Sequence, residues 1–297
     1  MSDTEQTPSA TPIWTGRAIL GEGPMWSPGR GRLFFVDILG HRILSCGLAG
    51  EAVAEWQLEE SPCWIVEQAG GEDFVVGLGR SVVVMRLTPG EPAVVRHVVT
   101  EPGLLPPGMR LNDAKADAEG RIYFGAMDDA EVEATGQLHL LGLDGTVTVL
   151  DQGYTVTNGP AISPDGRTLY HADSPARTVY AFDRRPDGGL TGKRVHIRLT
   201  EAEGYPDGMT VDAEGGLWVC HWDGGRVTRF TPDGARDRTI PLPASRVTSC
   251  AFCGPDLDRL AITTAAHERM EEPLAGALFL AQPGLLGLAP HRARLAV

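Results

Sequence analysis

Short runs of apolar residues recur along the chain, and turns rich in glycine separate them. The runs carry Val, Ile, Leu, Phe, Tyr and Trp in stretches of four or five, which is typical of short antiparallel strands. When the runs are aligned on their turns, six copies of a strand–turn–strand–turn–strand unit begin at residues 25, 64, 114, 161, 209 and 250. Successive copies are about 40 to 50 residues apart, which is the period of a propeller blade. The pattern therefore predicts an all-β fold, a six-bladed β-propeller with four-stranded antiparallel blades.

The fourth, outer strand of each blade has to come from the segments that link the copies. Segments such as RVHIRL (194–199) and RTIPLP (238–243) suit that position, and the opening PIWTGRAIL (12–20) is expected to pair with the last blade and close the ring. We therefore expect one propeller domain over residues 13–297, preceded by a disordered leader over residues 1–12. A β-sandwich is the main alternative, but its hairpins do not require this repeat length.

Composition and charge narrow the classes of partner. The net charge of −13 disfavours nucleic acid and anionic membranes, because no cluster of Lys and Arg offsets it. The chain has no run of 18 apolar residues and no signal-peptide pattern. Its five scattered cysteines favour reduced thiols, and hence a cytoplasmic protein. Cys250 and Cys253 have the spacing of half a zinc or redox motif, but on a strand they point to opposite faces, so packed thiols are favoured.

The triplet Pro-Asp-Gly occurs four times, and its phase within the repeat separates one copy from the others. Three copies fall in turns between or after strands, at 164–166, 186–188 and 232–234. Asp207 of the fourth copy stands instead just before an innermost strand, where the chain enters the central channel. Other copies of the repeat carry polar residues at the same phase: Glu22, Arg110, Asn112, Asp113 and Asn158. Because equivalent positions of a propeller converge on its axis, we expect these side chains to meet.

Glu22, Asn158 and Asp207 together offer two carboxylates and one amide oxygen. Oxygen donors of this kind suit a single divalent cation, which could be Ca²⁺, Mg²⁺, Mn²⁺, Fe²⁺ or Zn²⁺. Three protein ligands leave coordination positions open for water or a substrate carbonyl, as a Lewis-acid catalyst requires. Taken singly, Glu-Gly-Pro and Asn-Gly-Pro could be plain turns, but their shared phase favours a site.

Several motifs in order resemble the regucalcin and gluconolactonase family of metal-dependent sugar lactonases. They include LGEGPMW, RLNDAKADAEGRIYFGAM, TNGPAISPDGRTLYHADSPARTVYAFD and YPDGMTVDAEGGLWV, and YHADSPARTVYAFD looks closest to the bacterial xylonolactonase branch. The resemblance implies that Glu22, Asn158 and Asp207 are metal ligands and that Asp207 is also the catalytic acid and base. It further implies that Arg110 and Asn112 contact substrate.

One departure from the family pattern concerns a further substrate contact. Several relatives have a Glu shortly after a GTM-like stretch, whereas here GAM is followed by Asp128, Asp129, Ala130 and Glu131. Asp129 is our candidate for this contact, with Asp128 as the alternative. Asp37 and Asp173 share another phase of the repeat, and we interpret both as side chains that bond blade turns.

The expected reaction is hydrolysis of an aldonolactone, such as a xylono-, arabinono- or gluconolactone, to the sugar acid. The sequence leaves two alternatives open: a propeller hydrolase of aryl esters or organophosphates, and a non-catalytic calcium-binding regulatory protein. A serine esterase is disfavoured because the chain lacks Gly-x-Ser-x-Gly. The expected partner is the small sugar lactone, and we expect a monomer or weak homo-oligomer.

Overall fold

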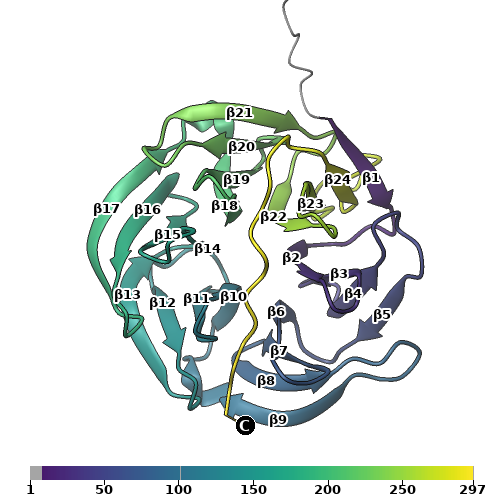
Figure 1. The fold of residues 1–297 in the computed structure, drawn as a ribbon, viewed down its shortest axis with the longest axis vertical. Coiled ribbons are helices and arrows are strands. Elements are labelled where there is room, and N and C mark those ends of the chain that lie inside the picture. The colour runs from purple at the N-terminus through teal and green to yellow at the C-terminus, as the bar shows by residue number, and fades with distance from the viewer. Residues whose placement is uncertain (1–8, 101, 297) are drawn as a thin grey trace, which may run out of the picture.

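Six four-stranded antiparallel sheets surround a central axis in the computed structural model, which describes residues 9–100 and 102–296 (Figure 1). The first strand of each sheet lies next to the axis, and neighbouring inner strands contact one another around the ring. The predicted six-bladed propeller is confirmed. Neither of the two short helices among the described residues has the length and apolar character needed to cross a bilayer.

Within each blade the strands follow one another from the axis outward. Blades one to three comprise β2 (Gly21–Ser27), β3 (Arg32–Asp37), β4 (Arg42–Cys46) and β5 (Ala54–Gln57); β6 (Pro62–Glu67), β7 (Asp73–Leu78), β8 (Ser81–Arg86) and β9 (Val94–Thr100); and β10 (Met109–Ala116), β11 (Ile122–Asp128), β12 (Gly136–Leu141) and β13 (Val147–Tyr154). Blades four to six comprise β14 (Thr157–Ile162), β15 (Thr168–Asp173), β16 (Thr178–Arg184) and β17 (Leu190–Arg198); β18 (Tyr205–Val211), β19 (Leu217–Trp222), β20 (Arg226–Phe230) and β21 (Arg236–Pro241); and β22 (Val247–Cys253), β23 (Arg259–Thr264), β24 (Leu278–Ala281) and β1 (Ala10–Trp14). The 3₁₀ helices are η1 (Pro102–Leu104) and η2 (Glu201–Glu203).

The first strand of the chain completes the last blade, where β1 is the outer strand (Figure 1). It pairs antiparallel with β24, with Ala10 opposite Ala281, so the predicted ring closure is confirmed. The boundary at residue 13 was placed too late, because the ladder bonds of β1 already order the chain from Ala10. Residues 1–8 of the expected leader lie outside the described residues.

Apolar side chains between neighbouring blades form the core. Trp64 and Phe124 belong to one buried cluster, which joins blades two and three, and Trp218 and Cys250 to another, which joins blades five and six. Cys253 lies in a different cluster, with Trp26 and Leu33 of blade one. The two thiols thus face opposite sides of blade six, and all five cysteines are buried and free, as packed thiols should be.

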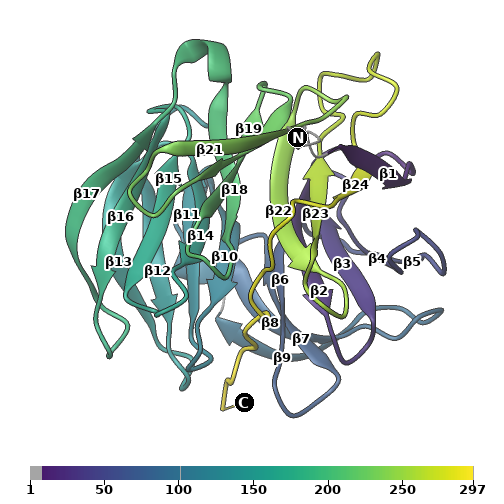
Figure 2. The ribbon, with the colours of Figure 1, turned by 45° about the horizontal axis from the view of Figure 1, so that its top comes forward.

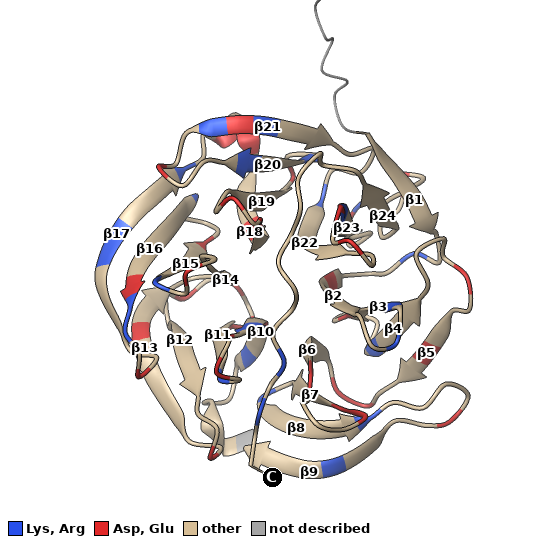
Figure 3. Cartoon of the chain, in the orientation of Figure 1, with Lys and Arg blue, Asp and Glu red and all other residues tan. Residues whose placement is uncertain are grey.

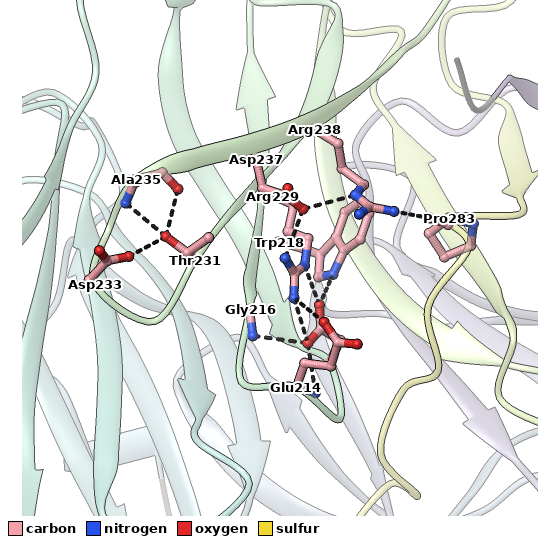
Figure 4. A network of polar contacts seen from close by, with 11 residues as sticks. Glu214, Gly216, Trp218, Arg229, Thr231, Asp233, Ala235, Asp237, Arg238 and Pro283 are labelled. Atoms are coloured by element: carbon pink, nitrogen blue, oxygen red, sulfur yellow. Dashed lines mark hydrogen bonds and ion pairs between the residues drawn. The ribbon is translucent and has the colours of Figure 1, made fainter. Parts of the chain in front are cut away.

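Buried ion pairs stabilise the turns that connect the first and second strands of two blades. In blade five Asp212, fully buried, accepts hydrogen bonds from the Trp218 indole (2.8 Å), the Gly216 backbone N–H (2.9 Å) and Arg229 Nε (2.6 Å). Figure 4 labels these three partners, together with Glu214 and Asp237, which also pair with Arg229. Blade three repeats the arrangement, because Asp117 pairs with Arg121 at 2.7 Å. Asp117 and Asp212 begin the two DAEG segments of the chain, at 117–120 and 212–215. Because both carboxylates are bonded to structural partners, these buried aspartates stabilise the fold.

The C-terminal segment after β24 crosses one face of the ring (Figures 1 and 2). Its backbone bonds to several blades in turn, for example from Gly287 N–H to the Leu257 carbonyl (2.8 Å) and from Ala293 N–H to the Glu67 carbonyl (2.9 Å). Leu288 and His291 of this segment line a cavity of about 270 Å³ at the C-terminal ends of the inner strands. That end of the channel is therefore covered, and the candidate site lies at the other end.

Candidate functional site

Each inner strand that carries a predicted site residue has a β-bulge at that residue. The pairing register shifts between Glu22 and Met25 in β2, and the corresponding shift follows Leu111 in β10, Asn158 in β14 and Pro206 in β18. A bulge turns the affected side chains out of the regular alternation. Glu22, Asn112, Asn158 and Asp207 are thereby presented to the end of the channel. Figure 3 shows how the acidic and basic residues are distributed over the six blades.

The sequence placed these residues just before the inner strands, and this placement is corrected by the structure. They lie inside the strands, because the residues at the start of each strand already pair with the second strand of the blade. In blade one, for example, Gly21 is opposite Asp37 and Glu22 is opposite Val36. The strand boundary differs by one to a few residues, and relative to the bulge Asp207 and Asn112 stand one residue later than Glu22 and Asn158.

The turn chemistry and the site chemistry of these motifs coexist. Gly23 and Gly159 have φ values of 52° and 68°, a conformation that favours glycine. The glycine that follows each polar residue is therefore needed for the sharp bend of the backbone. The N–H of Gly23 donates to Glu22 Oε2 at 3.0 Å, and the N–H of Gly208 donates to Asp207 Oδ1 at 3.0 Å. The bulge backbone therefore fixes the orientation of both carboxyl groups.

A cavity of about 240 Å³ opens above these groups at the N-terminal ends of the inner strands. Five of the six predicted site residues line it, and Asp129 does not. The polar part of the lining consists of Glu22, Arg110, Asn112, Glu131, Asn158, Ser174 and Asp207. The apolar part consists of Leu20, Val156, Pro175, Tyr205 and Trp222. Asp113, which follows Asn112, instead lines the covered cavity at the other end of the channel.

The carboxyl groups of Glu22 and Asp207 are both buried and line the same cavity. Burial, and then the charge of Asp113, raises the pKa of Glu22 to about 8. Burial, followed by the charge of Glu22, raises the pKa of Asp207 well above its usual value. Two acidic groups buried in the same cavity cannot both ionise without a compensating positive charge. In the absence of a cation, the raised pKa values favour the protonated forms of these carboxyl groups.

The donor set fits a divalent cation. Two carboxyl groups and the Asn158 amide oxygen are hard oxygen ligands, and a cation would neutralise the pair in place of the proton. The described residues contain no group of three His, Cys, Asp or Glu side chains arranged for a metal, and the set proposed here consists of two carboxyl groups and one amide. The residues present therefore fit a cation that keeps coordination positions open.

Hydrogen bonds connect the predicted substrate contacts to the predicted ligands. Arg110 Nη1 donates to Asn112 Oδ1 at 2.6 Å, and Asn112 Nδ2 donates to Asn158 Oδ1 at 2.9 Å. Asn112 Nδ2 also reaches the Thr157 carbonyl at 2.6 Å. The guanidinium and both amides thus form one connected wall of the cavity.

Two acidic residues of the β11–β12 loop pair with Arg110. Asp129 lies 3.1 Å from Arg110 Nε, and Glu131 lies 3.5 Å from Arg110 Nη2. Asp128 is used within the loop, where Oδ2 accepts the backbone N–H groups of Val132 and Glu133 at 3.0 Å each. Of the two aspartates considered, Asp129 is the one beside Arg110, and Glu131 is the loop residue that lines the cavity.

Sequence reasoning assigned no role to Glu131, Ser174, Tyr205 or Trp222, which all line the cavity. Tyr205 and Trp222 are cross-strand partners in β18 and β19. A guanidinium covers each ring, with Arg177 at 4.4 Å from the Tyr205 centroid and Arg246 at 4.5 Å from that of Trp222. Tyr205 stands two residues before Asp207, so strand alternation was the signal that could have found it.

The interpretation of Asp37 and Asp173 as structural residues is confirmed. Asp37 accepts the N–H groups of Ile19 (3.1 Å) and Leu20 (2.9 Å), which lead into β2. Asp173 accepts the equivalent N–H groups of Thr155 and Val156, which lead into β14. Each carboxylate holds the segment that enters an inner strand, and so positions Glu22 and Asn158 indirectly.

Comparison with known proteins shows the family of this chain. Residues 20–266 match the model of the SMP-30/Gluconolactonase/LRE-like region. The chain belongs to this family. The L-arabinolactonase of Azospirillum brasilense is 32% identical over 95% of this chain and 95% of its own length. The pentonolactonase XacC of Haloferax volcanii is 33% identical over 84% of this chain and 82% of its own length.

A solved structure described as luciferin-regenerating enzyme has the same fold. It superposes with a TM-score of 0.91 at 28% sequence identity, covering 97% of this chain and all of its own. The similarity to the family thus extends over nearly the whole propeller and includes every inner strand that carries a site residue.

Proposed function

We propose that the protein is a divalent-metal-dependent lactonase that hydrolyses an aldonolactone to the sugar acid. One observation carries the proposal: Glu22, Asn158 and Asp207 meet at an axial cavity whose wall also holds Arg110 and Asn112. The membership in the SMP-30/gluconolactonase family supports it, as do two relatives that are named for lactones of five-carbon sugars. A pentonolactone or hexonolactone is the substrate class that we expect.

Glu22, Asn158 and Asp207 would hold the cation, which when bound supplies a Lewis acid that polarises the lactone carbonyl. Asp207 accepts the proton of the attacking water as the water oxygen bonds to the carbonyl carbon. The bond from that carbon to the ring oxygen then breaks, and Asp207 returns the proton to the ring oxygen. The product is the open hydroxy acid.

The remaining cavity residues bind and orient the sugar. Arg110 faces the cavity with N–H donors that suit hydroxyl and carbonyl oxygens. Both N–H groups of Asn112 already bond to Thr157 and Asn158, so Asn112 would contact the sugar through Oδ1, which like Glu131 can accept a bond from a hydroxyl. Tyr205 and Trp222 provide an apolar wall on which the C–H face of a sugar ring can pack. Which of Ca²⁺, Fe²⁺, Zn²⁺, Mn²⁺ and Mg²⁺ supports the reaction is determined by a turnover assay.

The test is a turnover assay on xylono-, arabinono- and gluconolactone, with each cation added to the metal-free protein. Asp207→Ala removes a ligand and the base together, so we expect kcat to fall by about 10²–10⁴-fold or more while the protein stays folded. Asp165→Ala is the matched control, because Asp165 belongs to another Pro-Asp-Gly triplet and bonds only its own turn, at Ser163 and Arg167.

Three results would contradict parts of the proposal. Near-normal turnover by Asp207→Ala would remove Asp207 from catalysis. The absence of any cation-dependent lactone hydrolysis in the wild type, with turnover of an aryl ester or organophosphate instead, would support the esterase alternative. Binding of calcium without turnover of any of these substrates would support the regulatory alternative.

A further inference from the structure

Ser174 lies directly after β15 and lines the same cavity, with 8% of its surface exposed. Its hydroxyl makes two buried hydrogen bonds. The oxygen accepts from Asn158 Nδ2 at 2.9 Å, and the hydroxyl donates to the Pro206 carbonyl at 2.7 Å. Ser174 therefore links the bulge of blade four to the residue that precedes Asp207 in blade five.

Ser174 is the last side chain of a hydrogen-bonded chain that begins at Arg110. Arg110 donates to Asn112, Asn112 donates to Asn158, Asn158 donates to Ser174 and Ser174 donates to the Pro206 carbonyl. A guanidinium has no acceptor, and a backbone carbonyl has no donor. The two ends therefore force every bond in the chain to run in the same direction.

The direction of this chain decides which end of each amide faces which neighbour. The oxygen and nitrogen of an amide have nearly the same shape, so packing alone discriminates poorly between the two orientations. With Asn112 Nδ2 on one side and Ser174 Oγ on the other, Asn158 has to present Oδ1 toward Asn112. One lone pair of Oδ1 accepts that bond, and the second stays available for a cation.

If the amide of Asn158 were turned over, its NH₂ would face the NH₂ of Asn112, and the cation would meet N–H donors instead of an oxygen. We infer that Ser174 is a positioning residue, which holds Asn158 in its cation-binding orientation by accepting from Nδ2 and donating to Pro206. The inference rests on the proposed function, because it assigns Asn158 as a ligand. Groups that orient a metal ligand typically contribute about 10- to 100-fold to metal affinity.

The experiment is calorimetric titration of Ca²⁺ and Mn²⁺ into the metal-free full-length protein, with no lactone present. We expect Ser174→Ala to weaken binding by about tenfold or more. Ser174→Thr keeps the hydroxyl and should bind within about threefold of wild type. Ser81→Ala is the matched control, because this buried hydroxyl also donates to a backbone carbonyl, that of Leu78 at 3.0 Å, but accepts from no amide.

A second background separates orientation from general damage. Asn158→Asp replaces the amide by a carboxylate whose two oxygens are equivalent, so neither orientation presents a donor to the cation. In that background we expect Ser174→Ala to change the affinity by less than about threefold, against tenfold or more in the wild type. Comparable melting temperatures of the metal-free variants would show that the loss is confined to binding.

Three results would overturn the inference: wild-type affinity in Ser174→Ala, equal losses in the wild-type and Asn158→Asp backgrounds, or a Ser174→Thr variant as weak as Ser174→Ala. Failure here differs from failure of the proposed function. Metal-dependent lactone hydrolysis with no effect of Ser174 would overturn only the positioning role, whereas cation binding that depends on Ser174 without lactone turnover would overturn only the lactonase.

Discussion

At the scale of single residues, the site depends on two buried acidic side chains that line the same cavity. Glu22 and Asp207 have raised pKa values because burial and neighbouring negative charge penalise their ionised forms. Ionisation therefore has to be coupled to the arrival of a cation. This coupling makes the affinity for metal depend on pH in a direction that can be stated in advance.

We expect the affinity for a divalent cation to rise as the pH increases from about 4.5 to about 8. In the metal-free native state Glu22 keeps its proton up to a pKa of about 8, whereas its ordinary value is 4.5, so binding in this window releases protons. Each released proton contributes about a tenfold gain in affinity per pH unit. By the same sign, the metal-free protein binds more protons folded than unfolded in this window, and its stability falls as the pH rises. Titration and scanning calorimetry at several pH values measure the metal affinity and the stability of the metal-free protein, with Glu22→Gln for comparison. A metal affinity that does not change with pH would contradict the coupling.

Arg110 provides a second prediction at this scale. Arg110→Lys keeps the charge but loses the planar fork that holds two oxygens, so kcat/KM for the lactone should fall by about tenfold or more, or about 1.4 kcal/mol. Metal affinity should change much less, because the Lys ammonium group, like the guanidinium, is a pure donor and can keep the hydrogen bond to Asn112. Arg185→Lys, at an exposed ion pair with Asp187, is the control for the substitution itself. Unchanged lactone kinetics with weakened metal binding would make Arg110 a structural partner of the acidic residues.

At the scale of elements, the repeat could be predicted from sequence because each blade buries its own apolar runs. The convergence of Glu22, Asn158 and Asp207 followed from their common phase. The bulges were not predicted, because the alternation of apolar residues carries no signal for one extra residue in a strand. They occur in all six inner strands, including β6 and β22, which carry no predicted site residue. Glu131 and Trp222 were missed because they lie at or after the ends of second strands, where orientation is decided by tertiary pairs such as Arg110 with Glu131 and Arg246 with Trp222.

The turn network of blade five gives a prediction about stability. Arg229→Leu leaves the carboxylate of Asp212 buried without its ionic partner, so the free energy of unfolding should fall by about 3–5 kcal/mol. Arg238→Ala removes a more exposed pair with Asp237 and should cost at most about 1 kcal/mol. Denaturant unfolding of the two variants compares them directly. Equal small losses would mean that the Asp212 network adds little to the blade.

At the scale of the whole molecule, the ring is held by contacts that do not involve the axial site. β1 pairs with β24, the C-terminal segment bonds across several blades, and apolar clusters fill the space between neighbouring sheets. The fold should therefore persist without a cation, because the core and the ladders supply its stability. The monomeric or weakly oligomeric state expected from the sequence stays a prediction.

The most direct measurement of the central claim follows lactone hydrolysis and circular dichroism in the same sample during chelation. We predict that removing divalent cations abolishes hydrolysis while the β-sheet spectrum and cooperative unfolding are kept, and that adding back a single kind of cation restores turnover. Hydrolysis that continues in the chelated protein would contradict a metal-dependent site at Glu22, Asn158 and Asp207. Global unfolding on chelation would contradict it as well, because the cation would then serve the fold instead of the reaction.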